Sequence, residues 1–275
     1  MIMKRLSSVL MLAVVAGGVF FACESENVAP GDQIPEEVYS KLTQLGFSTD
    51  GLMRFEDGYL VENDIYLTDA DLGRMSPGKD IPTVEQYSTD NLVNGPRVIN
   101  VYMPTGRKGF SSGEQAGLDE AINRYNAESL TLTFQRVSSS GSADIVFKRL
   151  NKRDERRGVL GSAGFPTASG DPYGTINLSG ILESSYGLSV DGIATIIAHE
   201  MGHCIGFRHT DYFDRSISCG GSPYNEGDGG VGANHIPGTP TGADTSGNGS
   251  WMLSCTDGSS RPFTNDDKTA LDYLY

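Results

Sequence analysis

Three of the four histidines in this chain lie within eleven residues, at 199, 203 and 209. Residues four apart share one face of an α-helix, so His199 and His203 can present ring nitrogens to one metal ion. Gly206 can take the left-handed conformation that ends a helix, and the turn would bring His209 back as a third ligand. Three neutral imidazoles leave one position of a tetrahedral zinc ion open to water. This is typical of a catalytic rather than a structural site.

Glu200, next to the first histidine, has a carboxylate that suits a general base. Zinc lowers the pKa of its bound water to about 7. We expect Glu200 to take a proton from that water, so that the hydroxide attacks a peptide carbonyl carbon polarised by one Zn²⁺ ion. Glu200 could then pass the proton to the departing amine.

The helix that must carry these residues is predicted over residues 190–206, with Ser189 or Asp191 capping its start. Its apolar stripe is spaced by four, four and three residues and points away from His199, toward a core. The stripe consists of Ile193, Ile197, Met201 and Cys204. Its position makes Cys204 a buried thiol rather than a metal ligand.

Further elements can be placed before and after this helix. Strands are expected at 97–102, 130–137, 143–147 and 175–178, and helices at 112–127 and from 264 through 274. We therefore predict an α+β fold in which a mixed twisted sheet carries a backing helix and an active-site helix. The C-terminal subdomain should be rich in loops and end in a helix. Between 219 and 250, ten glycines and three prolines exclude regular structure and predict a loop wall of the substrate cleft.

The N-terminal third contains smaller elements. A basic pair and an apolar run precede Cys23, in a pattern that resembles the lipobox of bacterial lipoproteins, so residues 1–22 are predicted to be a signal peptide. Cys23 would then be lipidated and followed by a flexible tether over 23–33; alternatively, the signal is an ordinary one and Cys23 is incidental. Residues 34–95 should form an extension with a helix over 35–45 and a hairpin over 59–67.

The charge balance limits the partners of the protein. The 275 residues include 21 Lys and Arg against 35 Asp and Glu, a net charge of −14 that becomes −16 without residues 1–22. Such a surface repels a phosphate backbone, so we expect no nucleic-acid partner. We expect a monomer that binds a protein or peptide substrate. Its only contact with the membrane should be the lipid at its N-terminus.

The complete motif, with Met252 in a turn some forty residues later, resembles the metzincin clan of zinc endopeptidases. Three segments, at 202–211, 218–221 and 238–240, are similar to bacterial lipoproteins of the dual-action HEIGH metallopeptidase family. The resemblance covers residues 97–275 and implies a zincin or metzincin-like catalytic domain over 96–275. It also implies that Met252 is an apolar floor beneath the metal ligands. Residues 175–178 would be the antiparallel edge strand that aligns a peptide.

The sequence departs from the clan at one position, since some metzincins have Tyr where this chain has Ser254. The group that stabilises the oxyanion is therefore open, and Tyr212 is a candidate. In an oxidising compartment Cys219 and Cys255 are the expected disulfide, although three pairings of the remaining cysteines exist. Asp211 could orient a ligand or the chain N-terminus, or be solvated. An exposed His235 is expected rather than a second metal site.

These observations predict a zinc-dependent endopeptidase of the bacterial cell envelope, at the outer membrane and facing the periplasm or the surface. The alternative is a non-catalytic surface-binding lipoprotein that keeps a zincin scaffold. A third possibility is latency, with residues 34–95 as a pro-segment that covers the cleft through an acidic side chain. A thiol switch is disfavoured because this segment contains no cysteine.

Overall fold

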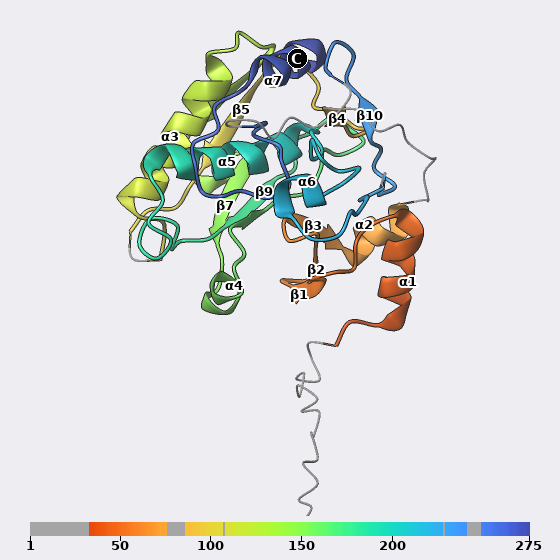
Figure 1. Cartoon of the computed structure of the whole chain (residues 1–275). Coiled ribbons are helices and arrows are strands. Elements are labelled where there is room, and N and C mark those ends of the chain that lie inside the picture. The colour runs from red at the N-terminus through yellow and green to blue at the C-terminus, as the bar shows by residue number, and fades with distance from the viewer. Residues whose placement is uncertain (1–32, 76–85, 107, 228, 241–248) are drawn as a thin grey trace, which may run out of the picture. The chain divides into compact units, whose positions relative to one another are not determined.

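The computed structural model describes residues 33–75, 86–106, 108–227, 229–240 and 249–275, and residues 34–275 form one compact unit (Figure 1). The expected signal peptide, Cys23, nearly all of the tether and part of the segment before residue 96 lie outside the described residues. Within the described ranges, no helix is both long and apolar enough to cross a bilayer.

The central sheet has five strands in the order β6-β5-β7-β9-β8. Neighbouring strands run parallel except the outer strand β8, which is antiparallel to β9. The strands are β5 (Arg97–Tyr102), β6 (Leu132–Arg136), β7 (Ile145–Arg149), β8 (Gly161–Ser162) and β9 (Thr175–Leu178). The expectation that 175–178 is the antiparallel edge strand is therefore wrong. The short β8, whose two small residues carry no strand periodicity, takes that place.

Two helices pack against each other on one side of this sheet (Figure 1). The backing helix α3 (Ser112–Asn126) begins with a capping box between Ser111 and Glu114. The active-site helix α5 (Val190–Ile205) begins at the Ser189 cap and ends at Gly206, which has a φ of 115°. The predicted stripe on α5 is confirmed, since Ile193, Ile197, Met201 and Cys204 are all fully buried in the main core.

A second, smaller core lies in the N-terminal part of the described chain. It joins α1 (Glu36–Leu45), β2 (Gly58–Val61), β3 (Ile65–Thr68) and α2 (Asp69–Arg74), whereas β1 (Met53–Phe55) packs in a separate small cluster. Strands β2 and β3 pair antiparallel with Val61 opposite Ile65, which confirms the predicted hairpin. Phe165 and Val231 from the rest of the chain pack against this second core.

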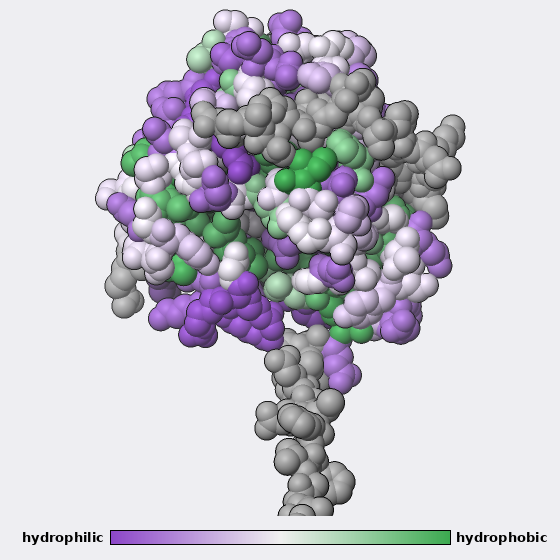
Figure 2. All heavy atoms as spheres, in the orientation of Figure 1, coloured by the Kyte–Doolittle hydropathy of each residue, from purple (hydrophilic) through white to green (hydrophobic). Residues whose placement is uncertain are grey.

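The remaining elements are short, apart from the predicted C-terminal helix α7 (Asn265–Leu274), which begins with a capping box between Thr264 and Asp267. They are β4 (Tyr87–Ser88), η1 (Ser140–Ser142), α4 (Lys152–Arg156), α6 (Ser216–Cys219) and β10 (Asn234–His235). Strand β10 pairs with β4, so the expectation of no regular structure between 219 and 250 is wrong at this point. Figure 2 shows hydrophilic side chains over much of one face, including the place of α4.

Candidate metal centre

The three histidines of the motif meet at the C-terminal end of α5. His199 and His203 lie one helical turn apart, and the chain reversal at Gly206 brings His209 back toward both. The Nε2 atoms of His203 and His209 are 3.2 Å apart, and the three ring centroids are separated by 4.7 to 5.2 Å. All three side chains are buried. The spacing in the sequence therefore does bring these three rings together.

Backbone carbonyls fix the orientation of the first two rings. His199 Nδ1 donates to the carbonyl oxygen of Trp251, and His203 Nδ1 donates to that of Phe207, each at 2.9 Å. Because a carbonyl can only accept, the proton must be on Nδ1 and the lone pair of Nε2 faces the other histidines. These are the tautomers that metal ligation requires.

The third ring is fixed by Glu226, a residue that the sequence analysis missed. Its carboxylate lies 2.9 Å from His209 Nδ1 and 3.1 Å from the guanidinium of Arg215. Burial alone would raise the pKa of Glu226, but the adjacent His209 and Arg215 outweigh it and lower that pKa. Ser254, the departure from the metzincin pattern, is within hydrogen-bond distance of the same carboxylate at 3.1 Å. In the sequence, Glu226 stands in a glycine-rich segment without a motif, so no local pattern predicts its contact with His209.

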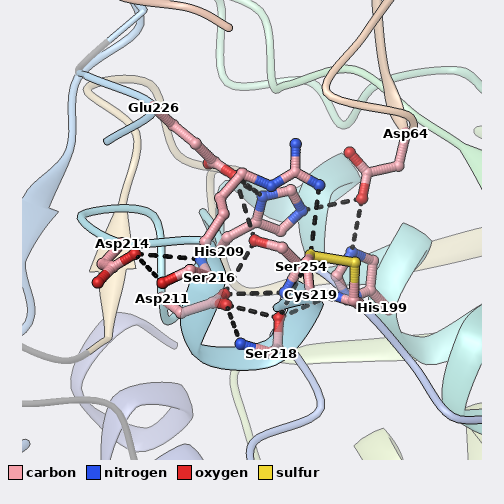
Figure 3. The surroundings of a disulfide bond; sticks show 12 residues. Asp64, His199, His209, Asp211, Asp214, Ser216, Ser218, Cys219, Glu226 and Ser254 are labelled. Carbon is pink, nitrogen blue, oxygen red and sulfur yellow. Dashed lines mark hydrogen bonds and ion pairs between the residues drawn. A yellow bond between two sulfur atoms is a disulfide. The ribbon is translucent and has the colours of Figure 1, made fainter. Parts of the chain in front are cut away.

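A second carboxylate reaches the histidines from the turn between β2 and β3. Asp64 Oδ2 is 3.0 Å from His209 Nε2 and 3.6 Å from His199 Nε2 (Figure 3). Together with His203, these residues offer ligand atoms that all lie within 4.8 Å of one another. The other oxygen of Asp64 is buried without a hydrogen-bond partner. Such a cluster of buried, convergent donors fits a metal ion.

Glu200 lies beside this cluster, against the edge strand. Its side chain is 2 % exposed, and its Oε2 has no hydrogen-bond partner. A Cβ atom added at Gly161 of β8 would come within 2.4 Å of Glu200 Oε1, so the carboxylate occupies the space that a side chain at this position would fill. Burial, with a contribution from Asp64, raises the pKa of Glu200 well above its usual range. A buried carboxyl group with a raised pKa in such a position is a candidate general base.

A cavity of about 240 Å³ is lined by His199, Glu200 and Asp64. Its wall combines residues of the segment leading into β8, of α5 and of the segment after Trp251, including Leu160, Ile196, Leu253 and Arg261. The cavity therefore offers a largely apolar space, with Arg261 as the one cation among its described lining residues, next to His199 and the two carboxylates.

Met252 and the disulfide fix the segment around residues 251–255 next to the histidines. Met252 is fully buried, and a Cβ added at Gly202 of α5 would come within 2.6 Å of its sulfur. The Met252 carbonyl accepts from the backbone N–H of Thr210, next to His209. Cys219 and Cys255 form a disulfide, while Cys204 is a buried free thiol, as expected.

Asp211 is fully buried, so of the alternatives left open for it the solvated one is wrong. One of its oxygens accepts from the backbone and hydroxyl of Ser218, and the other accepts from those of Ser254 (Figure 3). Asp211 therefore ties the loop after His209 to the segment that follows Met252.

Tyr212 and His235 also differ from the sequence expectations. Tyr212 is fully buried and packs edge-on against Tyr87, with ring centroids 4.1 Å apart. This position disfavours a role in holding an oxyanion. His235 is half-buried in β10, where its Nε2 lies 3.2 Å from the Thr239 hydroxyl.

Comparisons with known proteins bear on what this cluster does. Among solved structures, "Structure of Myroilysin" has 16 % identity and a TM-score of 0.42, and the match covers 72 % of this chain and 89 % of that one. "GM1 bound form of the ECX AB5 holotoxin" has 19 % identity and a TM-score of 0.38, with coverage of 67 % and 81 %. No curated protein matches the chain. The model of the dual-action HEIGH metallo-peptidase family matches residues 59–275. The chain therefore belongs to this family of metallopeptidases.

Proposed function

We propose that the protein is a zinc-dependent endopeptidase that hydrolyses peptide bonds outside the cytoplasm, with Glu200 as the general base. One observation supports this most strongly: the Nε2 atoms of His199, His203 and His209 converge next to a buried carboxylate. A metallopeptidase acts on protein or peptide substrates, and the adjoining cavity offers space for a substrate side chain.

The donors favour zinc. Imidazole nitrogens bind zinc at about 2.0 Å, so two ligands of a tetrahedral ion are separated by about 3.3 Å. The Nε2 atoms of His203 and His209 are 3.2 Å apart, in agreement with that separation. We assign His199, His203 and His209 as ligands of one Zn²⁺ ion.

When bound, zinc supplies Lewis acidity: it polarises the carbonyl of the substrate and lowers the pKa of water. Glu200 takes the proton of the attacking water and transfers it to the departing amine. The side chain is held for this role between α5 and the glycine of β8. A substrate strand would pair with the outer edge of β8, because the backbone N–H and C=O groups of a sheet edge can bind an extended peptide. Met252 would serve as the metzincin-like floor of the site.

We further propose that residues 1–22 direct export and that a lipid on Cys23 anchors the protein in the cell envelope through the tether 23–33. The catalytic domain spans 96–275 and is preceded by the extension 34–95. The protein would act as a monomer without a nucleic-acid partner. Zinc content and cleavage assays on the full chain test the central part of this proposal.

We predict that Glu200→Gln leaves zinc binding intact and lowers cleavage of a denatured protein or peptide library by about 10²- to 10⁴-fold. The amide keeps the size of the side chain but cannot accept the proton. Zinc per chain is measured by elemental analysis, and cleavage by mass spectrometry. Glu36→Gln, on the exposed surface of α1, is the matched control and should leave both unchanged.

Equal cleavage by wild type and Glu200→Gln would contradict the mechanism, and so would the absence of bound zinc. Zinc binding without cleavage of any peptide would instead favour a non-catalytic binding protein. The intact Glu200 disfavours that alternative, because a binding function would not need this buried carboxylate.

A further inference from the structure

The carboxylate of Asp64 lies among the proposed zinc ligands, although the proposed reaction has no use for it. We propose that Asp64 is the fourth ligand of the metal and that, through it, the turn between β2 and β3 keeps the peptidase latent. This inference rests on the proposed function, since it names a regulatory state of the same site.

The distances from Asp64 are those expected of a ligand. Its Oδ2 lies 3.0 Å from His209 Nε2 and 3.6 Å from His199 Nε2. Two ligands of tetrahedral zinc are about 3.3 Å apart, and a carboxylate oxygen binds zinc at about 2.0–2.2 Å. Three imidazoles and one carboxylate would complete a four-coordinate site.

An ion pair with His209 alone explains less of the geometry. It accounts for the distance of 3.0 Å, but it does not require His199 and His203 to face the same point. It also leaves the other carboxylate oxygen of Asp64 buried and without a hydrogen-bond partner. A shared metal ion accounts for the convergence of all four side chains.

The backbone around Asp64 covers the sheet edge as well. The Asp64 carbonyl accepts from the N–H of Ala163, and the N–H of Tyr66 donates to the Ala163 carbonyl, each at 3.0 Å. Ala163 directly follows β8, and it forms a parallel β-bridge with Ile65 of β3. These are edge groups that an extended peptide would need for pairing, so the turn competes with a substrate for both the edge and the metal.

The turn is held in place by its own contacts. Val61 and Ile65 on either side are fully buried in the N-terminal core. Glu62 in the turn is buried and accepts from the backbone N–H of Ser48 at 2.9 Å. The family match begins at residue 59 and therefore includes this hairpin. The inhibiting carboxylate thus belongs to a packed part of the chain. We therefore expect the most populated state to be the closed one, in which Asp64 occupies the fourth position on the metal.

The ligand assignment is tested on the full chain with cobalt in place of zinc, comparing wild type with Asp64→Asn. The absorption bands of Co²⁺ report its ligands, and the rate at which a chelator extracts zinc reports the strength of binding. We expect the variant to have a changed cobalt spectrum and to lose zinc at least about 10-fold faster. Asp57→Asn is the matched control, because Asp57 is exposed in the neighbouring turn between β1 and β2; it should behave as wild type.

Latency is tested with acetohydroxamate, which binds an accessible metal through two oxygens, and with cleavage of a peptide library. The open state is the one in which Asp64 has left the metal. If it is about 0.1–10 % populated, removal of the fourth ligand should raise both the affinity for acetohydroxamate and the rate of cleavage about 10- to 1000-fold. Identical cobalt spectra and zinc loss in wild type and Asp64→Asn would overturn the ligand assignment. A changed spectrum with unchanged acetohydroxamate affinity would overturn latency.

A failure of the proposed function would give different results. Either no variant would bind zinc, or Asp64→Asn would bind both zinc and acetohydroxamate and still cleave no peptide. Misfolding is checked by thermal unfolding of each variant. The hydrogen bonds that Asp64 makes to Val61 and Ala163 use its backbone, so the asparagine variant retains them. Asp64→Ala gives a second test with the same expected result.

Discussion

At the residue scale, His209 differs from the other two metal-facing histidines in its partners. The rings of His199 and His203 donate to neutral carbonyls, whereas His209 lies between the carboxylates of Asp64 and Glu226. Burial lowers the pKa of His209, but the two carboxylates outweigh it and raise that pKa well above the usual value. The two carboxylates therefore stabilise the proton on His209, and a metal ion that binds this ring would compete with that proton.

Metal affinity should therefore fall as the pH is lowered through the pKa of His209, beginning above the ordinary histidine value of about 6.5. Glu226→Gln removes one charge that raises this pKa, so the loss of affinity should begin at a lower pH. Zinc affinity is measured between pH 6 and 9 by competition with a chelator of known protonation. An affinity that does not change over this range would contradict the prediction.

At the element scale, the end of α5 decides whether the third histidine reaches the first two. Gly206 has a φ of 115°, and a Cβ there would come within 2.8 Å of Leu92 and 3.1 Å of the Asn91 carbonyl. The Gly206 carbonyl also accepts from the N–H of Thr89 at 2.8 Å. The segment before β5 is therefore packed directly onto the turn, and both space and conformation require glycine.

We expect Gly206→Ala to lower the free energy of unfolding by about 1–3 kcal/mol more than Gly187→Ala does. Gly187 is a matched control, because its φ is 67° and a Cβ there meets no atom within 4 Å. Both variants place alanine at a positive φ, which destabilises each of them. The difference between their free energies of unfolding therefore reports the close contacts at Gly206. Denaturant unfolding measures it, and equal destabilisation of the two variants would show that these contacts are unimportant.

At the scale of the whole molecule, the site is assembled from segments far apart in the sequence. The disulfide between Cys219 and Cys255 closes a loop with a sequence separation of 36 and joins the two segments that Asp211 also connects. Glu226 lies inside this loop, and Met252 lies just before its second cysteine. The disulfide therefore confines the part of the chain that contains Glu226 and Met252, which lie next to the proposed metal ligands.

Replacing both cysteines by serine should lower the free energy of unfolding by about 2–4 kcal/mol, because the unfolded chain regains the freedom of the closed loop. Denaturant unfolding of the Cys219→Ser/Cys255→Ser variant measures this loss. Wild type under reducing conditions is the matched comparison and should approach the variant. The prediction is wrong if the variant and the oxidised wild type unfold at the same denaturant concentration.

The sequence by itself determined the features that depend on short spacing. The interval between His199 and His203, the left-handed glycine at 206 and the apolar stripe each act within a few turns of one helix, so their geometry follows from helical periodicity. The capping boxes at Ser111 and Thr264 are local for the same reason. The β2–β3 hairpin was predictable because two apolar runs flank a short polar turn.

Only the tertiary structure decided which carboxylates reach the histidines and which strand lies at the sheet edge. Asp64 is 145 residues from His209 and Glu226 is 17 away, in loops where an acidic residue carries no periodic signal. The edge strand β8 has two residues, too few for alternation to show. Such contacts arise when separately formed elements pack together, and no local pattern records which element will meet which.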